Sequence, residues 1–105
     1  MTLFDEREQA FEAKFVHDAD MRFRIQARRD KLLGLWAADL LGKTGTEATS
    51  YAQSVVSADL EEAGHEDVVR KLSADLGSRV SEAQIRAKLL ELLPQAQLEI
   101  MQEAD

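Results

Sequence analysis

The strongest indication of the fold comes from residues 20–42, DMRFRIQARRDKLLGLWAADLLG. Its large apolar side chains recur at helical spacing, and Gly42 is a natural left-handed end for a helix. These apolar positions are Ile25, Leu32, Leu33, Leu35, Trp36, Leu40 and Leu41. Gly34 lies inside the pattern, where glycine costs about 1 kcal/mol relative to alanine. We therefore expect a long helix ending near Leu41 that another helix approaches closely at Gly34.

Three further helices are predicted after this stretch. Thr44 and Glu47 have the spacing of a capping box, and the helix that they would start continues to Gly64. A shorter helix is expected from Glu66 to Leu76, closed by Gly77. The expected inward positions of these two helices are Ala48, Tyr51, Ala52, Val55, Val56, Leu60, Ala63, Val68, Val69, Leu72 and Leu76.

The last predicted helix starts at a second capping box, formed by Ser81 and Gln84. Its expected inward positions are Ile85, Leu89, Leu92, Leu93, Ala96 and Ile100. Pro94 lies within this pattern, and a proline removes one N–H and crowds the preceding turn. Because the apolar period continues beyond it, we expect a kink at Pro94 and not the end of the helix.

Residues before the long helix form an amphipathic segment of a different kind. From Thr2 to about His17, Phe4, Phe11 and Phe15 fall on one helical stripe, interrupted by Glu8. Isolated helices of this length are marginal in water. Two arrangements are therefore possible for the aromatic stripe. It packs on the rest of the chain, or the helix inserts into a groove of a partner.

Together these patterns predict an all-α fold, a four-helix bundle preceded by an amphipathic N-terminal helix. Strand signals are nearly absent, and the predicted loops are short enough to connect antiparallel neighbours. We expect two parts, an N-terminal segment of residues 1–19 and a helical bundle of residues 20–105.

The charge of this 105-residue chain is unevenly distributed. The formal net charge is -7, with a balance of -4 over residues 1–20, +4 over residues 21–31 and -7 over the rest. The basic residues either pair with acids on neighbouring helices or form a docking surface together with the acidic leader. An overall negative charge argues against nucleic acid as a partner, because phosphate binding needs a basic surface.

Several other classes of protein are disfavoured. Without cysteine the chain has no disulfide scaffold, and its apolar runs are too short for direct membrane insertion. His17 and His65 lie in no catalytic motif, and we expect His65 to cap a helix or face solvent. Trp36 and Tyr51 lie within apolar stripes, which favours core packing over a stacking platform. We expect no catalytic residue, no metal site, no cofactor and no enzymatic activity.

The sequence resembles the zeta subunit, an inhibitor of the F-type ATP synthase in alphaproteobacteria. The resemblance covers nearly the whole chain, and its most specific part is KLLGLWAA at Lys31–Ala38. The other matching stretches are Phe4–Glu8, Ala10–Phe15, His17–Ala19, Ala27–Arg29, Leu40–Gly42, Tyr51–Ala52, Val55–Val56, Glu61–Gly64 and Asp67–Leu72.

The resemblance implies a four-helix bundle preceded by a mobile amphipathic N-terminal helix, and a mechanism without chemistry of its own. Residues 1–19 would enter the catalytic head of the synthase between the alpha and beta subunits, near gamma, and stop rotation in the ATP-hydrolysing direction. Phe4, Phe11 and Phe15 would be apolar anchors, while Arg7, Glu8, Glu12 and Lys14 would make polar contacts. The protein would be a monomer when free, and cytoplasmic, peripheral to the inner membrane through the synthase.

Two departures from the family pattern concern the bundle. Asp30 stands where the family commonly has asparagine, and we expect it to form a local ion pair with Arg28 and Arg29 that changes little. Pro94 has no counterpart in that pattern. Two alternative functions stay open, a helical module that binds a nucleotide through Arg22, Arg28 and Arg29, and a structural coiled-coil adaptor, which the lack of a persistent heptad pattern disfavours.

Overall fold

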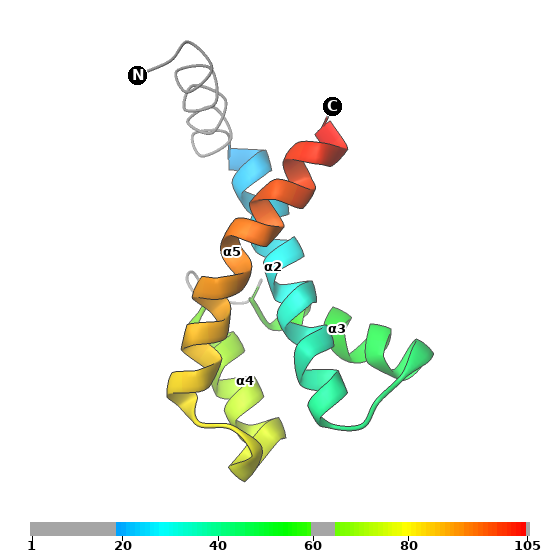
Figure 1. The fold of residues 1–105 in the computed structure, drawn as a ribbon, viewed down its shortest axis with the longest axis vertical. Coiled ribbons are helices and arrows are strands. Elements are labelled where there is room, and N and C mark those ends of the chain that lie inside the picture. The colour runs from blue at the N-terminus through cyan, green and yellow to red at the C-terminus, as the bar shows by residue number, and fades with distance from the viewer. Residues whose placement is uncertain (1–18, 60–64, 105) are drawn as a thin grey trace.

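The computed structural model describes residues 19–59 and 65–104, and these residues form four α-helices (Figure 1). The helices are α2 (Ala19–Leu40), α3 (Gly45–Asp59), α4 (Glu66–Leu76) and α5 (Glu82–Ala104), with a 3-10 turn, η1 (Gly77–Arg79), before α5. Within these described ranges there is no strand. The predicted all-α fold is therefore confirmed, and the described helices lie where the sequence pattern placed them. The inward positions predicted at Leu60 and Ala63 and the helix end predicted at Gly64 lie outside the described residues.

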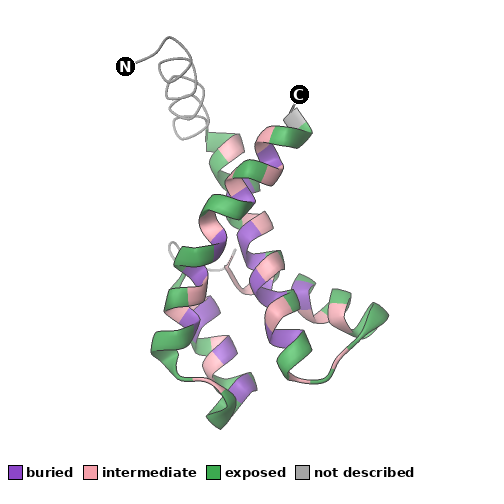
Figure 2. Cartoon of the chain, in the orientation of Figure 1, coloured by how far each residue is buried: buried purple, intermediate pink, exposed green. Residues whose placement is uncertain are grey.

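Helix α2 is the centre of the fold. It packs against α3 and α5 and makes a smaller contact with α4. Figure 2 shows buried positions along α2 where it meets these neighbours. The main core draws on all four helices and consists of Leu33, Ala37, Val55, Val68, Val69, Leu72, Leu76, Ile85, Leu89 and Leu92. All four inward positions predicted for α4 are buried, as are Ile85, Leu89, Leu92, Ala96 and Ile100 of α5.

Two leucines of residues 20–42 do not belong to this core. Leu35 and Leu40 are exposed, whereas Leu33, two residues before Leu35, is fully buried. Helix α2 also buries small residues, Gly34, Ala37 and Ala38. The buried surface of α2 is therefore set as much by small residues that admit neighbouring helices as by its large apolar side chains.

Gly34 lies at the closest contact between α2 and α3. A Cβ atom added at this position would lie 2.6 Å from the Cα of Ala52 and 3.1 Å from its Cβ. The obstacle is thus backbone of α3, which cannot move aside as a flexible side chain can. The predicted close approach of another helix at Gly34 is confirmed, and the helix concerned is α3.

The predicted helix ends are mostly confirmed by their hydrogen bonds. After α2 the N–H of Lys43 donates to the carbonyl of Ala38 (2.9 Å) and that of Gly42 to Asp39 (3.1 Å), with Gly42 at a φ of +76°. This pair of bonds is the Schellman motif. At the start of α5, Ser81 and Gln84 exchange the two bonds of a capping box, at 2.8 and 3.1 Å.

The capping box predicted at Thr44 was wrong, although the position of the helix was right. Among the described residues Thr44 and Glu47 exchange no such bonds, and Gly45, the first residue of α3, has a φ of +56°. This left-handed conformation turns the chain between Thr44 and the body of the helix. The hydroxyl of Thr49 instead donates to the carbonyl of Gly45 at 3.2 Å.

Helix α5 continues through Pro94, as the apolar period predicted. The proline is exposed, while Leu92 and Ala96 on either side of it are buried. The carbonyl of Leu90, which loses its helical partner, belongs to a residue that is 74% exposed. The proline is tolerated because its cost falls on the solvent side of the helix, where water can satisfy that carbonyl.

Candidate functional site

The residues predicted to bind a partner lie outside the described residues. These are Phe4, Arg7, Glu8, Phe11, Glu12, Lys14 and Phe15. The structure describes the helix that follows this segment in the sequence, because α2 begins at Ala19. The start of α2 and the end of α5 lie at the same end of the molecule, away from the η1 turn (Figure 1).

A small second core holds this end of the molecule together. Ile25 of α2 packs with Ala96 and Ile100 of α5, and all three are buried. Met21, Leu32, Leu93 and Met101 pack against them and are partly buried. The α2–α5 pair therefore has an apolar interface of its own beyond the four-helix core, and this interface positions the first turns of α2.

Arg28 ties the same two helices together through charge. Its Nη1 donates to Oε1 of Glu99 at 2.8 Å, and its Nη2 donates to Glu103 one turn further along α5. Gln95 donates to the other oxygen of Glu99 at 2.9 Å. The hydrogen bonds from Gln95 and Arg28 lower the pKa of Glu99, and those to Glu103 and Glu99 raise the pKa of Arg28. The contact is therefore fully ionised near neutral pH.

The charges of the basic stretch are largely used within the fold. Besides Arg28, Arg24 pairs with Asp20 one turn earlier at 3.2 Å, and Arg29 contacts Asp30 and Asp59. Of the two predicted roles of this stretch, the structure supports pairing with neighbouring acids. Arg22 and Lys31 are exposed.

An open hollow of about 430 Å³ lies beside the α2–α5 pair. Its walls combine apolar and basic side chains, and Phe23, at 51% exposure, is the largest exposed aromatic among the described residues. The lining residues are Phe23, Arg24, Ala27, Arg28, Lys31, Gln53, Val56, Ile100 and Glu103.

The three arginines suggested for nucleotide binding do not form one site. Only Arg28 lines the hollow, and its guanidinium is already bound by two carboxylates. Arg29 is buried at a different contact, and Arg22 does not line the hollow. A phosphate would have to displace existing ion pairs to bind here, so the structure offers no specific support for the nucleotide alternative.

The predicted ion pair of Asp30 with Arg29 is confirmed, but the predicted pair with Arg28 and the minor role of Asp30 were wrong. Asp30 is 1% exposed, Arg28 points to α5 instead, and the second partner of the Arg29–Asp30 pair is Asp59 at the end of α3. A signal for this burial exists in the sequence, because Asp30 has helical spacing with Leu33, Gly34 and Ala37. Reasoning from neighbouring charges alone missed it.

The remaining candidate residues have structural roles. Trp36 and Tyr51 pack against the main core as predicted, with Lys88 and Lys71 over their rings at 5.7 and 5.0 Å. The Tyr51 hydroxyl also donates to Asp75 at 2.7 Å. His65 is exposed and precedes α4 without a side-chain capping bond, so the solvent-facing alternative is the correct one.

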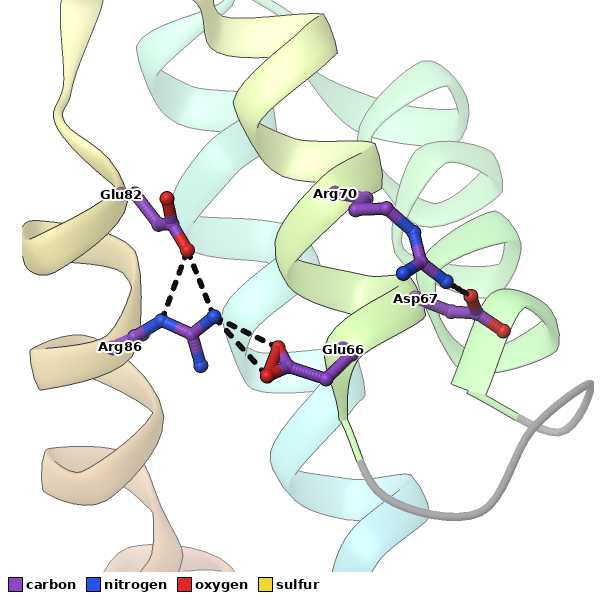
Figure 3. Close-up of polar contacts among 5 residues, drawn as sticks. All are labelled: Glu66, Asp67, Arg70, Glu82 and Arg86. Carbon is purple, nitrogen blue, oxygen red and sulfur yellow. Dashed lines mark hydrogen bonds and ion pairs between the residues drawn. The ribbon is translucent and has the colours of Figure 1, made fainter.

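Exposed ion pairs join α4 to α5 on another face of the molecule (Figure 3). Arg86 donates to Glu82 one turn earlier and to both oxygens of Glu66 at the start of α4, the shortest distances being 2.8 Å. This contact lowers the pKa of Glu66. Asp67 and Arg70 form a separate pair within α4. Such exposed pairs contribute little stability and hold no reactive group.

The described residues also lack the features of two other kinds of site. In these ranges no three histidine, aspartate or glutamate side chains lie in an arrangement that could hold a metal ion. None of the described helices has the length and apolar character needed to cross a membrane.

Comparisons with known proteins agree with the fold and cover the predicted N-terminal segment as well. The family model of ATPase inhibitor subunit zeta matches residues 1–99. A protein solved by solution NMR superposes with a TM-score of 0.74 at 53% sequence identity, covering 79% of this chain and 98% of that chain. No curated protein sequence matches. Because the family model spans almost the whole chain, this chain belongs to the ATPase inhibitor subunit zeta family.

Proposed function

We propose that this chain inhibits ATP hydrolysis by the F-type ATP synthase, and that residues 1–19 are its inhibitory segment. Membership of a family of ATPase inhibitors is the observation that carries this proposal, because the family match begins at residue 1 and includes the whole segment. An inhibitor of this kind is a regulatory protein and not an enzyme. It would reach the membrane through the synthase, as a cytoplasmic peripheral component.

The proposed mechanism is a wedge. Residues 1–19 would enter between the alpha and beta subunits near gamma and block rotation in the direction of ATP hydrolysis. Phe4, Phe11 and Phe15 would supply apolar anchors, because buried aromatic side chains often dominate binding energy at interfaces. Arg7, Glu8, Glu12 and Lys14 would make the polar contacts.

The described residues support this division of labour. The buried apolar side chains of the described residues lie between Ile25 and Ile100 and form two cores that join α2 to the other helices. The second core and the Arg28 contact then hold the first turns of α2 firmly on α5. A segment that blocks a rotating subunit must be attached to a rigid domain, because a flexible attachment would bend under the force of rotation.

A pair of matched substitutions tests the proposal. Phe11→Ala removes one proposed anchor, and Phe23→Ala makes the same chemical change in the bundle at a side chain that is 51% exposed. We expect Phe11→Ala to weaken inhibition of the purified ATPase by at least tenfold, since truncation of an anchor costs about 2 kcal/mol or more. Phe23→Ala should inhibit like the unaltered protein.

A truncated chain that starts at Asp20 tests the segment as a whole. It should not inhibit ATP hydrolysis at any concentration at which the full chain does. Full inhibition by the truncated chain would disprove the role of residues 1–19, whereas absence of inhibition by the full chain would disprove the proposed function itself. Titration with ATP or ADP, followed by NMR chemical shifts, tests the nucleotide alternative separately.

A further inference from the structure

Three charged side chains are buried together where the end of α3 meets the middle of α2. Arg29 is 7% exposed, Asp30 is 1% exposed, and the side chain of Asp59 is 9% exposed. The Nε and Nη2 atoms of Arg29 donate to Oδ1 of Asp30 at 3.3 and 3.2 Å. Nη2 also lies 3.8 Å from Oδ2 of Asp59. We call these three residues the buried cluster.

The charges of the buried cluster do not balance if both carboxyl groups are ionised. One guanidinium then faces two carboxylates, which leaves a net negative charge out of contact with water. Burying an uncompensated charge is strongly unfavourable. In addition, Oδ1 of Asp59 is buried and has no hydrogen-bond partner among the described residues. A single added proton would correct both defects.

We infer that Asp30 and Asp59 share one proton at neutral pH, with Asp30 in the neutral form, and that this proton joins α3 to α2. The O–H of Asp30 then donates to the carboxylate of Asp59, whose buried Oδ1 otherwise has no hydrogen-bond partner among the described residues. Arg29 lies between the two carboxyl groups, with its Nη2 3.2 Å from Oδ1 of Asp30 and 3.8 Å from Oδ2 of Asp59. The buried cluster becomes neutral overall, and the contact between two helices depends on a proton.

The surroundings of Asp30 support this protonation state. Burial raises the pKa of Asp30, and contact with Asp59 raises it further, to about 8, although Arg29 opposes the change. Other charged groups on neighbouring helices are engaged elsewhere. On α5, Glu99 and Glu103 bind Arg28. On α4, the ion pairs are Asp67 with Arg70, Lys71 with Asp75, and Glu66 with Arg86 of α5.

Protonation of Asp30 makes the free energy of unfolding depend on pH. The pKa of Asp30 is higher in the folded chain than its ordinary value of 3.8, so folding takes up a proton between that pH and about 8. Stability from this group is complete at low pH and is lost as the pH rises toward and through about 8. Alkaline conditions should therefore weaken the joint between α2 and α3 first.

Carbon NMR of the side-chain carboxyl groups of the full-length protein tests the inference directly. The Asp30 carboxyl signal should titrate near pH 8. Titration of Asp30 near its ordinary pKa would overturn the inference. This measurement needs no variant and so does not depend on a variant folding.

Asp30→Asn gives a second test with a matched control. Asparagine keeps the shape of the neutral side chain and still donates to Asp59, but it cannot titrate. Between about pH 5 and about pH 7 we expect the unfolding midpoint of the unaltered chain to fall as the pH rises, with release of about one proton on unfolding. The Asp30→Asn variant should lose this pH dependence, while Asp39→Asn, an exposed change on the same helix, should keep it.

Asp59→Asn distinguishes a shared proton from burial alone. Removing the second carboxylate removes the like charge that favours the proton on Asp30, so the pKa of Asp30 should fall measurably toward its ordinary value. An unchanged Asp30 titration in this variant would overturn the shared proton. Equal pH dependence of stability in the Asp30→Asn variant and the unaltered chain would also do so.

Discussion

At the scale of single residues, Gly34 shows why an unfavourable residue sits in the middle of a helix. Glycine weakens α2 by about 1 kcal/mol relative to alanine, yet the backbone of Ala52 leaves no room for a Cβ atom. Local helix propensity and tertiary packing make opposite demands at this position. Packing prevails because the obstacle is the main chain of α3, and moving it would disturb the whole α2–α3 contact.

Gly34→Ala should therefore destabilise the protein in spite of its gain in helix propensity. We expect a net loss of about 1–3 kcal/mol in the free energy of unfolding, the usual cost of overpacking. Urea denaturation monitored by circular dichroism measures it. Gln26→Ala, an exposed change on the same helix, is the control and should stay within about 0.5 kcal/mol. A more stable Gly34→Ala variant would contradict the close α2–α3 approach.

At the scale of elements, α5 shows that a strong helix breaker can be overridden by its neighbours. Buried side chains continue on both sides of Pro94, from Ile85 to Ile100, and this continuous face packs against α2 and α4. The capping box of Ser81 and Gln84 fixes the start of the same helix. Packing along its full length therefore holds α5 together through the proline.

Pro94→Ala should stabilise the protein. The substitution restores an N–H that can donate to the carbonyl of Leu90, and it removes the ring that crowds the preceding turn. We expect a gain of about 1 kcal/mol, below the roughly 3 kcal/mol propensity difference because α5 already accommodates the proline. Thermal unfolding measures it, with Gln102→Ala on the exposed side of α5 as control. A loss of stability would mean that α5 needs the geometry that the proline imposes.

At the scale of the whole molecule, the described helices form a bundle with its own buried core, and we propose that residues 1–19 are a separate functional part. Buried side chains within residues 19–59 and 65–104 pack against one another in two connected cores. The negative net charge of the chain is partly balanced inside the fold by pairs such as Arg28 with Glu99. Inhibition and folding stability should therefore be separable properties.

Removal of residues 1–18 should leave the fold intact. We expect the unfolding midpoint of the shortened chain to stay within about 4 °C of that of the full chain, which corresponds to less than about 1 kcal/mol for a domain of this size. Calorimetry measures the midpoint, and amide hydrogen exchange of α3 and α4 serves as an internal control. A large loss of cooperativity would show that residues 1–18 pack on the bundle.

Much of the fold could be predicted because its signals are local. Helix spacing, the glycine ends at Gly42 and Gly77, and the capping box at Ser81 depend on residues a few positions apart, and all of them were confirmed. The capping box at Thr44 was wrong because the same spacing does not guarantee the backbone conformation that a cap requires. Family membership was also predicted from sequence, through KLLGLWAA and the motifs around it.

The sequence by itself determined the positions of the helices and the family of this protein, because helical hydrogen bonds and caps join neighbours in the chain. Which charges are paired between helices and which are buried depends on the tertiary structure and was not predicted from the sequence. Arg28 donates a hydrogen bond to Glu99, 71 positions away in the sequence. Asp30 is buried together with Asp59 of α3. Burial and pairing depend on how helices distant in sequence meet, and a charged residue takes its protonation state from those contacts.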